Sequence, residues 1–224
     1  MLERRPSNAQ LWAKYQPRWA SYRHAPYNFD PAPLAHLGPS QGWHRDHHAI
    51  DLPAEAPGPA EATGSFAAAC QVLRHYAFPP PRLLVGIYEP GAPLAGRLML
   101  LRGRFLGFTF WFGVRVGPVL NEVGLPSAQG PEQVWGYGYR TLQGHFERGQ
   151  IDFTVHKNLQ TGAVQFRTDA VSQQAVIRNP FYWLGFKVFG RLLQRRFAHQ
   201  SMARMRGLVL EMLAQPQTMP ETLG

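Results

Sequence analysis

The feature that most constrains the fold is a long helical pattern at the C-terminal end, directly after a series of strand patterns. Asn179-Pro180 is a typical helix start, because asparagine caps a first turn well and proline fits the first helical position. Apolar residues then recur at roughly helical spacing to Ala214, and Pro216 lies just beyond. A helix of about thirty residues spans about 45 Å, which is long enough to cross a whole sheet.

The segments before this helix alternate between apolar and polar residues, as half-buried strands do. Residues 135–142 and 146–156 are expected as neighbouring strands, and residues 164–170 continue the pattern. A hairpin loop at 158–162 separates the last two, with Gly162 as its residue of positive φ. Together these segments predict a meander of antiparallel strands.

Residues 97–122 are also expected to form strands. Residues 108–112 are apolar on both faces, which predicts a strand that is buried on both sides. The chain turns at either Arg102–Arg104 or Leu106–Gly107, and Gly117-Pro118 predicts a bulge or a break. Two shorter strands are expected at residues 42–52 and 83–88.

Two shorter helices are expected near the N-terminal end, at residues 8–19 and 64–76. Thr63 is the expected N-cap of the second helix, and the prolines at 79–81 end it. The rest of the first 41 residues is rich in proline and aromatic residues, which predicts an extended arm. Four aromatic side chains are expected to fasten this arm to the domain: Trp12, Trp19, Tyr22 and Tyr27.

This order of elements predicts an α+β fold in which an antiparallel sheet curls around a long C-terminal helix, a helix-grip architecture. We divide the chain into a wrapping arm at 1–41, a helix-grip domain at 42–215 and a tail at 216–224. Such a sheet can leave a cavity between its concave face and the helix. Aromatic residues make up 12% of the chain and can either line this cavity or fill it.

Composition narrows the classes of function. The net charge of +9 favours anionic partners, but the arginines are spread along the chain and no nucleic-acid-binding motif is present, so the sequence does not favour nucleic acid. Neither a signal peptide nor an apolar stretch of about 18 residues is visible, so we expect no transmembrane segment and a cytoplasmic location. Cys70 is the single cysteine and lies in an apolar helical pattern, typical of an inert core thiol.

Functional side chains are densest between Trp135 and Phe153. His145 and Glu147 stand two residues apart, so in a strand they share one face. A carboxylate can orient a histidine and support its charged form, so this pair could perform acid–base chemistry; it could equally be a hairpin corner and a structural ion-pair partner. With residues of neighbouring strands the pair is expected to form a polar ligand site at the cavity mouth: Arg115, Glu122, Tyr137, Tyr139, His145 and Glu147.

The sequence contains only weak indications of metal, cofactor or membrane binding. On a strand, His44 and His48 share a face while His47 points away, and no carboxylate is placed to complete a metal site. No phosphate-binding loop or dinucleotide fingerprint is present, so we expect neither a cofactor nor a metal. A basic face of the C-terminal helix is either solvated or in contact with an anionic ligand or an anionic membrane surface: Arg191, Arg195 and Arg196.

The sequence resembles an uncharacterised family of bacterial and plant proteins. The family hallmark is roughly Tyr-Gly-Thr-Leu-Pro-Gly-His-x-Glu-x-Gly-Glu-Glu, and it is matched here by Tyr139, Thr141, Leu142, Gly144, His145, Glu147 and Gly149. An upstream element is matched by Arg115, Val116 and Glu122, and a downstream one by Leu193, Gln194, Arg196 and Phe197. The resemblance spans residues 42–206 and implies a layout similar to START-like, helix-grip proteins, which bind lipids, hormones and other apolar ligands.

The chain departs from this family pattern mainly at charged positions. Gln150 and Ile151 stand where the family has paired acids, and Asn121 replaces an aspartate. Other departures are Arg140 in place of glycine, Gln143 in place of proline and Gln173 in place of arginine. If the acids served a polar chemistry, the resemblance implies that this chemistry is lost or altered here.

Three hypotheses follow. The first is a protein that holds an apolar or amphipathic small ligand between the sheet and the C-terminal helix. The second is an enzyme on the same scaffold that uses His145 and Glu147 as acid and base. The third is a structural or membrane-peripheral adaptor with a filled interior.

Overall fold

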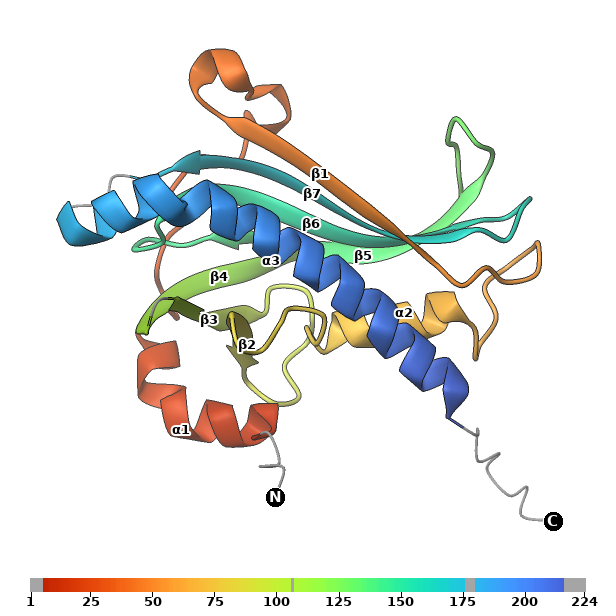
Figure 1. Ribbon diagram of the computed structural model, residues 1–224, viewed down its shortest axis with the longest axis horizontal. Coiled ribbons are helices and arrows are strands. Elements are labelled where there is room, and N and C mark those ends of the chain that lie inside the picture. The colour runs from red at the N-terminus through yellow and green to blue at the C-terminus, as the bar shows by residue number, and fades with distance from the viewer. Residues whose placement is uncertain (1–5, 106, 176–179, 216–224) are drawn as a thin grey trace.

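The computed structural model describes residues 6–105, 107–175 and 180–215, and seven antiparallel strands form one sheet within them (Figure 1). The order across the sheet is β1-β7-β6-β5-β4-β3-β2, so the last six strands form a meander and β1 pairs with β7. The strand bounds are β1 His44–Leu52, β2 Leu84–Tyr88, β3 Leu98–Phe105, β4 Phe108–Leu125, β5 Glu132–Thr141, β6 Glu147–Asn158 and β7 Val164–Gln174. The predicted meander is confirmed.

Within the described residues, three α-helices pack against this sheet: α1 Asn8–Ala20, α2 Ser65–Arg74 and α3 Pro180–Ala214. Two short 3-10 turns, η1 Leu34–His36 and η2 Pro39–Gln41, precede β1. Helix α2 packs on β5, β6 and β7, and α3 crosses over α2 and β1 on the same face (Figure 1). We call this face the inner face. The predicted α+β fold, a curled antiparallel sheet gripping a long C-terminal helix, is confirmed.

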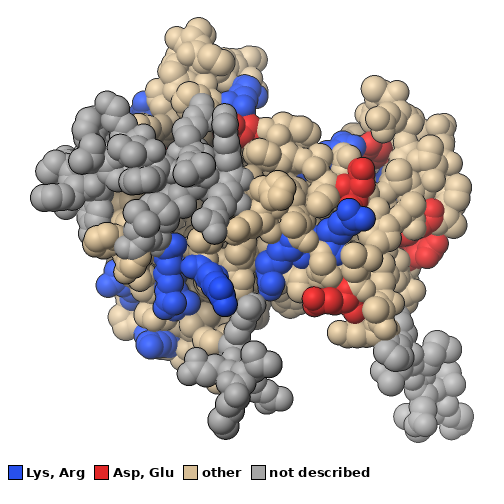
Figure 2. Space-filling model, viewed as in Figure 1, with Lys and Arg blue, Asp and Glu red and all other residues tan. Residues whose placement is uncertain are grey.

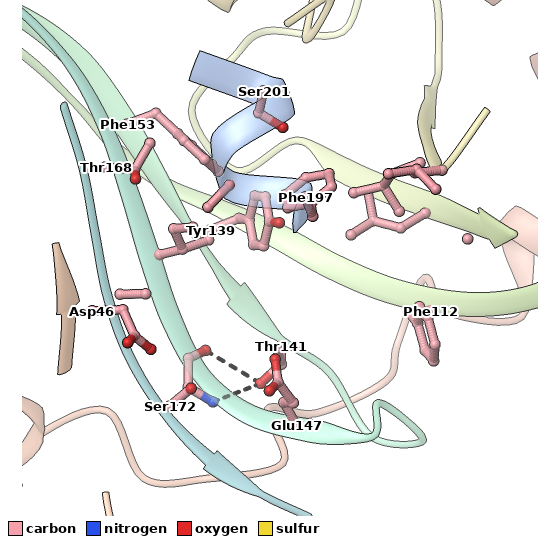
Figure 3. A pocket seen from close by; sticks show the side chains of 18 of the residues that line it. Asp46, Phe112, Tyr139, Thr141, Glu147, Phe153, Thr168, Ser172, Phe197 and Ser201 are labelled. Carbon is pink, nitrogen blue, oxygen red and sulfur yellow. Dashed lines mark hydrogen bonds between the residues drawn. The ribbon is translucent and has the colours of Figure 1, made fainter. Parts of the chain in front are cut away.

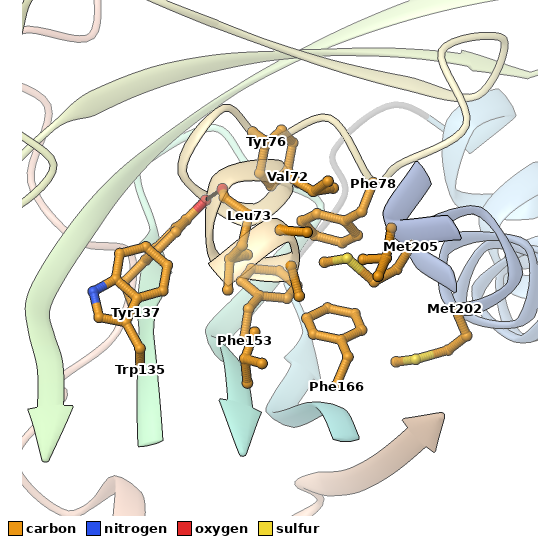
Figure 4. Packing of buried hydrophobic residues seen from close by; sticks show 14 of the residues in the cluster. Val72, Leu73, Tyr76, Phe78, Trp135, Tyr137, Phe153, Phe166, Met202 and Met205 are labelled. Atoms are coloured by element: carbon orange, nitrogen blue, oxygen red, sulfur yellow. Dashed lines mark hydrogen bonds between the residues drawn. The ribbon is translucent and has the colours of Figure 1, made fainter. Parts of the chain in front are cut away.

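The main core lies between the inner face, α2 and α3 (Figure 4). Phe78, Phe153 and Phe166 are at most 1% exposed, and Met205 of α3 is fully buried beside them. The ring centroid of Phe78 lies 5.0 Å from that of Phe153 and 5.4 Å from that of Phe166, within the usual range for aromatic pairs. Some of the aromatic residues of the chain therefore fill the interior.

The N-terminal arm packs on the outer face, over β2 and β3. Trp19 is 5% exposed, and its indole N–H donates to the Leu98 carbonyl at 3.1 Å. Tyr22 lies directly over Gly113 of β4, where any side chain would collide with the tyrosine ring. All four aromatics expected to fasten the arm belong to this second cluster or pack against it.

The start of α2 differs from the prediction. Thr63 is not the N-cap; Gly64 occupies that position and makes no side-chain cap. The Phe66 amide instead donates to Glu55 Oε1 at 2.7 Å, so a carboxylate from the preceding loop satisfies the helix start. The buried Glu55 is held in turn by Lys157 Nζ at 2.7 Å.

Four local predictions can be compared with the strands and their turns. The burial of residues 108–112 on both sides is wrong: Phe108 is 60% exposed, because it lies at the tip of the β3–β4 hairpin. Of the two predicted turn positions, the second agrees with the structure at Gly107, which has a φ of 81°, and Gly162 has the predicted positive φ of 75°. The register between β4 and β5 shifts between Val116 and Val119, as Gly117-Pro118 predicted. The predicted helix cap Asn179 lies outside the described residues.

Candidate functional site

The inner face of the sheet and α3 enclose a cavity of about 380 Å³. Its walls come from all seven strands, from the loop before β2, from the turn between β5 and β6 and from the described part of α3. Pockets that bind small molecules have volumes of about 300–1,000 Å³. The sheet therefore encloses enough space for a small ligand, next to a core that is filled.

The side of the cavity nearest the core is apolar (Figure 3). Phe153 of β6 and Tyr139 of β5 form its floor, with ring centroids 5.4 Å apart. Phe197 and Met202 of α3 close it from above, and Met202 is only 6% exposed. The aromatic residues thus both fill the core and line the cavity, the two alternatives that the sequence left open.

Polar groups gather at the opposite end of the cavity. Asp46 of β1, Thr141 of β5, Glu147 of β6 and Ser172 of β7 lie there in Figure 3. The pairing of β1 with β7 and of β7 with β6 brings these residues together from distant parts of the sequence. The cavity is therefore amphipathic, with one apolar end and one polar end.

The N-terminal arm fixes the turn between β5 and β6, which carries His145 and Glu147. The Asn28 side-chain amide donates to the Glu147 carbonyl at 2.8 Å, and Thr141 Oγ1 donates to Asn28 Oδ1 at 2.6 Å. The Gly149 amide donates to the same Thr141 hydroxyl at 2.9 Å. Residues of the arm thus position one wall of the cavity, a role that no sequence pattern indicated for Asn28.

His145 is a neutral group in this turn. The Glu147 amide N–H donates to His145 Nδ1 at 3.0 Å, so this nitrogen keeps a lone pair and the ring proton lies on Nε2. The ring lies 4.6 Å from that of Phe112, and burial lowers the pKa of His145 to about 4 because the charged form is poorly solvated there. The contact between the two predicted catalytic residues runs through the Glu147 backbone.

The two predicted tyrosines have different surroundings. Tyr139 lines the cavity, and its hydroxyl lies 3.3 Å from that of Tyr76. Tyr137 lies beneath α2, where its hydroxyl donates to the Leu73 carbonyl at 2.8 Å. Burial raises the pKa of both phenols, that of Tyr139 to about 12, so both are neutral at physiological pH.

Arg115 and Glu122 lie away from the cavity. The Arg115 guanidinium donates to the carbonyl of Arg23 in the arm at 2.8 Å. Glu122 is exposed on the part of β4 that follows the bulge. Of the six predicted ligand residues, the structure brings together Tyr139, His145 and Glu147, and it does not bring Arg115, Glu122 and Tyr137 to the same cavity.

The remaining candidate groups have ordinary surroundings. His47 Nδ1 lies 2.7 Å from Asp169 Oδ1 in an exposed pair, and within the described residues no group of three histidine, cysteine or acidic side chains could hold a metal. Burial raises the pKa of the Cys70 thiol to about 12, which makes it a poor nucleophile. The side chains of Arg191, Arg195 and Arg196 lie outside the described part of the chain.

Sequence reasoning missed several residues of the cavity wall. Asp46 alternates with exposed residues on an edge strand, so no local pattern distinguishes it. Ser201 had a weak signal, because it stands four residues after Phe197 and next to Met202 on an otherwise apolar stripe of α3. Lys and Arg side chains gather over the β3–β4 hairpin on the face shown in Figure 2.

Fold and cavity define a class: α+β proteins in which a curled antiparallel sheet and a C-terminal helix enclose a cavity. The chain belongs to the family described as a domain of unknown function, DUF1990, which matches residues 32–204. No curated protein matches its sequence. Among the described residues, none of the helices contains a stretch long and apolar enough to span a membrane.

Solved structures with a similar fold share little sequence with this chain. Ara h 8.0201 is 11% identical with a TM-score of 0.45, and the match covers 76% of this chain and 99% of that one. A point mutant of norcoclaurine synthase from Thalictrum flavum, in complex with a transition-state analogue, is 11% identical with a TM-score of 0.45, over 75% and 95% of the two chains. The Zhui aromatase/cyclase from Streptomyces sp. R1128 is 14% identical with a TM-score of 0.43, over 76% and 93%.

Proposed function

We propose that this protein binds an apolar or amphipathic small molecule in the cavity between the inner face of the sheet and α3. The observation that carries the proposal is the cavity itself, about 380 Å³ in volume, apolar towards the core and polar at the other end. Burial of apolar ligand surface supplies most of the binding free energy in such a site, and a few polar groups fix the orientation.

Three of the residues predicted from the sequence have roles in this proposal. Tyr139 contributes part of the apolar floor. His145 and Glu147 stand at the polar end, on a turn that Asn28 and Thr141 hold in place. A neutral His145 with its proton on Nε2 is a hydrogen-bond donor for a neutral or anionic ligand group.

The geometry favours binding over acid–base catalysis by His145 and Glu147. A histidine with a pKa of about 4 is a weak base at neutral pH, and a general base works best when its pKa lies near the operating pH. A filled interior, which the adaptor hypothesis requires, is not favoured by the volume of the cavity.

Replacing two alanines of α3 by phenylalanine, one at a time, tests the proposal. Ala198 lines the cavity, whereas Ala203, just over one turn further on, is exposed. With the neutral fluorescent probe N-phenyl-1-naphthylamine, we expect saturable binding to the wild type, at least about tenfold weaker binding to Ala198→Phe because the ring takes up the ligand volume, and no change in Ala203→Phe. Equal binding to all three proteins would place the probe elsewhere and refute the proposal.

Native mass spectrometry of protein purified from its own host complements this titration. A stoichiometric adduct that is present in the wild type and absent from Ala198→Phe would identify the natural ligand.

A further inference from the structure

Ser201 of α3 is a buried hydroxyl without a hydrogen-bond partner among the described residues. It is 2% exposed, and its Oγ neither donates nor accepts there. A serine within a helix ordinarily returns its hydroxyl to the carbonyl four residues earlier, but Ser201 does not. Its hydroxyl instead points into the cavity beside Phe197 (Figure 3).

The Ser201 hydroxyl lies among apolar neighbours on α3. These neighbours are Phe197 and Met202, and no charged residue is labelled at this end in Figure 3. The other polar residues there are Thr168 and Tyr139, whereas Asp46, Thr141, Glu147 and Ser172 lie at the opposite end. A buried polar group with no partner destabilises the folded protein, so an orphan hydroxyl on an apolar wall needs an explanation such as a ligand.

Tyr139 provides a second hydroxyl on the same side of the cavity. Within the described residues its hydroxyl bonds to the Tyr76 hydroxyl at 3.3 Å, and Tyr76 is 6% exposed in the core. Two neutral phenols that share one hydrogen bond use one proton, and the proton of the other remains available for a further acceptor. Tyr139 is the member of the pair that lines the cavity.

We propose that Ser201 binds a neutral oxygen of the ligand, a hydroxyl or a carbonyl, inside the apolar end of the cavity, with Tyr139 as the second hydroxyl at this position. The inference rests on the proposed function and specifies its ligand class: an apolar ring or chain compound that carries an uncharged oxygen at its buried end. A carboxylate or ammonium is disfavoured at this position because the wall there supplies no counter-charge and desolvating an ion is costly.

Competition between two probes of nearly equal shape tests this inference. Naphthalene and 2-naphthol each displace N-phenyl-1-naphthylamine from wild type, Ser201→Ala and Met202→Leu, where Met202→Leu changes the same wall without a polar group. We expect 2-naphthol to bind the wild type about tenfold more tightly than naphthalene, because it satisfies the orphan hydroxyl. The preference should shrink to about twofold or less in Ser201→Ala and persist in Met202→Leu.

The direction of the change separates a ligand contact from a loss of structure. Ser201→Ala should bind naphthalene at least as tightly as the wild type, because the unpaired hydroxyl is gone, whereas a damaged fold would weaken both ligands. A tenfold preference that survives in Ser201→Ala overturns the inference and leaves the proposed function standing. Failure of the fluorescent probe to bind the wild type overturns both.

Discussion

Replacing Glu55 by alanine removes one partner of a buried ion pair that holds the start of α2. Glu55 Oε2 lies 2.7 Å from Lys157 Nζ, and the two side chains are 2% and 0% exposed. The ammonium also donates to the Pro59 carbonyl at 2.9 Å. The carboxylate accepts from the amides of Phe66 at 2.7 Å and Glu61 at 3.0 Å, so one side chain joins a strand, a loop and a helix.

The expected cost follows from what the alanine leaves behind. Lys157 keeps a buried charge with only one carbonyl as partner, and breaking a buried pair from one side costs about 3–5 kcal/mol. The loss of the acceptor for the first turn of α2 adds about 1 kcal/mol. The sum of about 4–6 kcal/mol is a large part of the about 5–15 kcal/mol that stabilises a typical domain.

Urea unfolding followed by tryptophan fluorescence measures this loss. Glu61→Ala is the matched control, because Glu61 lies in the same loop and is exposed; it should cost less than about 1 kcal/mol. The double variant Glu55→Leu with Lys157→Met should recover most of the stability, since it leaves no charge buried. A cost below about 1 kcal/mol for Glu55→Ala would refute the reasoning.

The same pair predicts a pH dependence. Burial opposes ionisation of Glu55, but hydrogen bonds from Lys157, Phe66 and Glu61 outweigh it and hold the pKa of Glu55 below its usual value of 4.5. A carboxyl whose pKa is lowered by folding stabilises the protein fully above the unfolded value, and this contribution disappears as the pH falls below about 4.5. Glu55→Ala should therefore flatten the loss of stability between about pH 5 and 3, measured as urea midpoints.

Two further predictions concern the site turn and the arm. In an NMR titration of the native protein, His145 should stay neutral until the pH falls to about 4. Its contribution to stability is therefore present above the usual pKa of 6.5 and is lost as the pH falls from 6.5 to about 4. A titration midpoint near 6.5 would contradict the burial argument. Gly113→Ala should cost about 1–3 kcal/mol in urea unfolding because the Tyr22 ring occupies the space, whereas Gly103→Ala has ordinary contacts and should cost less; equal costs would contradict it.

The strands and the terminal helix could be predicted because their signals are local. Alternation in residues 146–156 and 164–170 depends only on neighbours two residues apart, and Gly162 marks its own turn. The cap of α2 could not be predicted in this way. Its acceptor, Glu55, stands 11 residues before Phe66, and the lysine that holds it follows 102 residues after Glu55.

The candidate site was predicted only in part, because position along a strand matters as much as the face. Tyr137 and Tyr139 point to the same inner face, yet α2 covers the first and leaves the second in the cavity. Arg115 and Glu122 are separated by the bulge at Gly117-Pro118, which changes the register between them. Local alternation specifies the face of a residue, but not which helix lies above it.

Three of the departures from the family pattern divide into two kinds once their faces are known. The Arg140 side chain donates a hydrogen bond to Gln150 across β5 and β6 at 2.8 Å, and Gln150 donates to Asp152 at 2.8 Å. On the outer face these departures therefore form a row of hydrogen-bonded side chains. Ile151 faces inward and lines the cavity. The resemblance implies an acid at this position, and an acid there would place a carboxylate on the cavity wall. The isoleucine makes the cavity more apolar, in agreement with a ligand whose buried oxygen is uncharged.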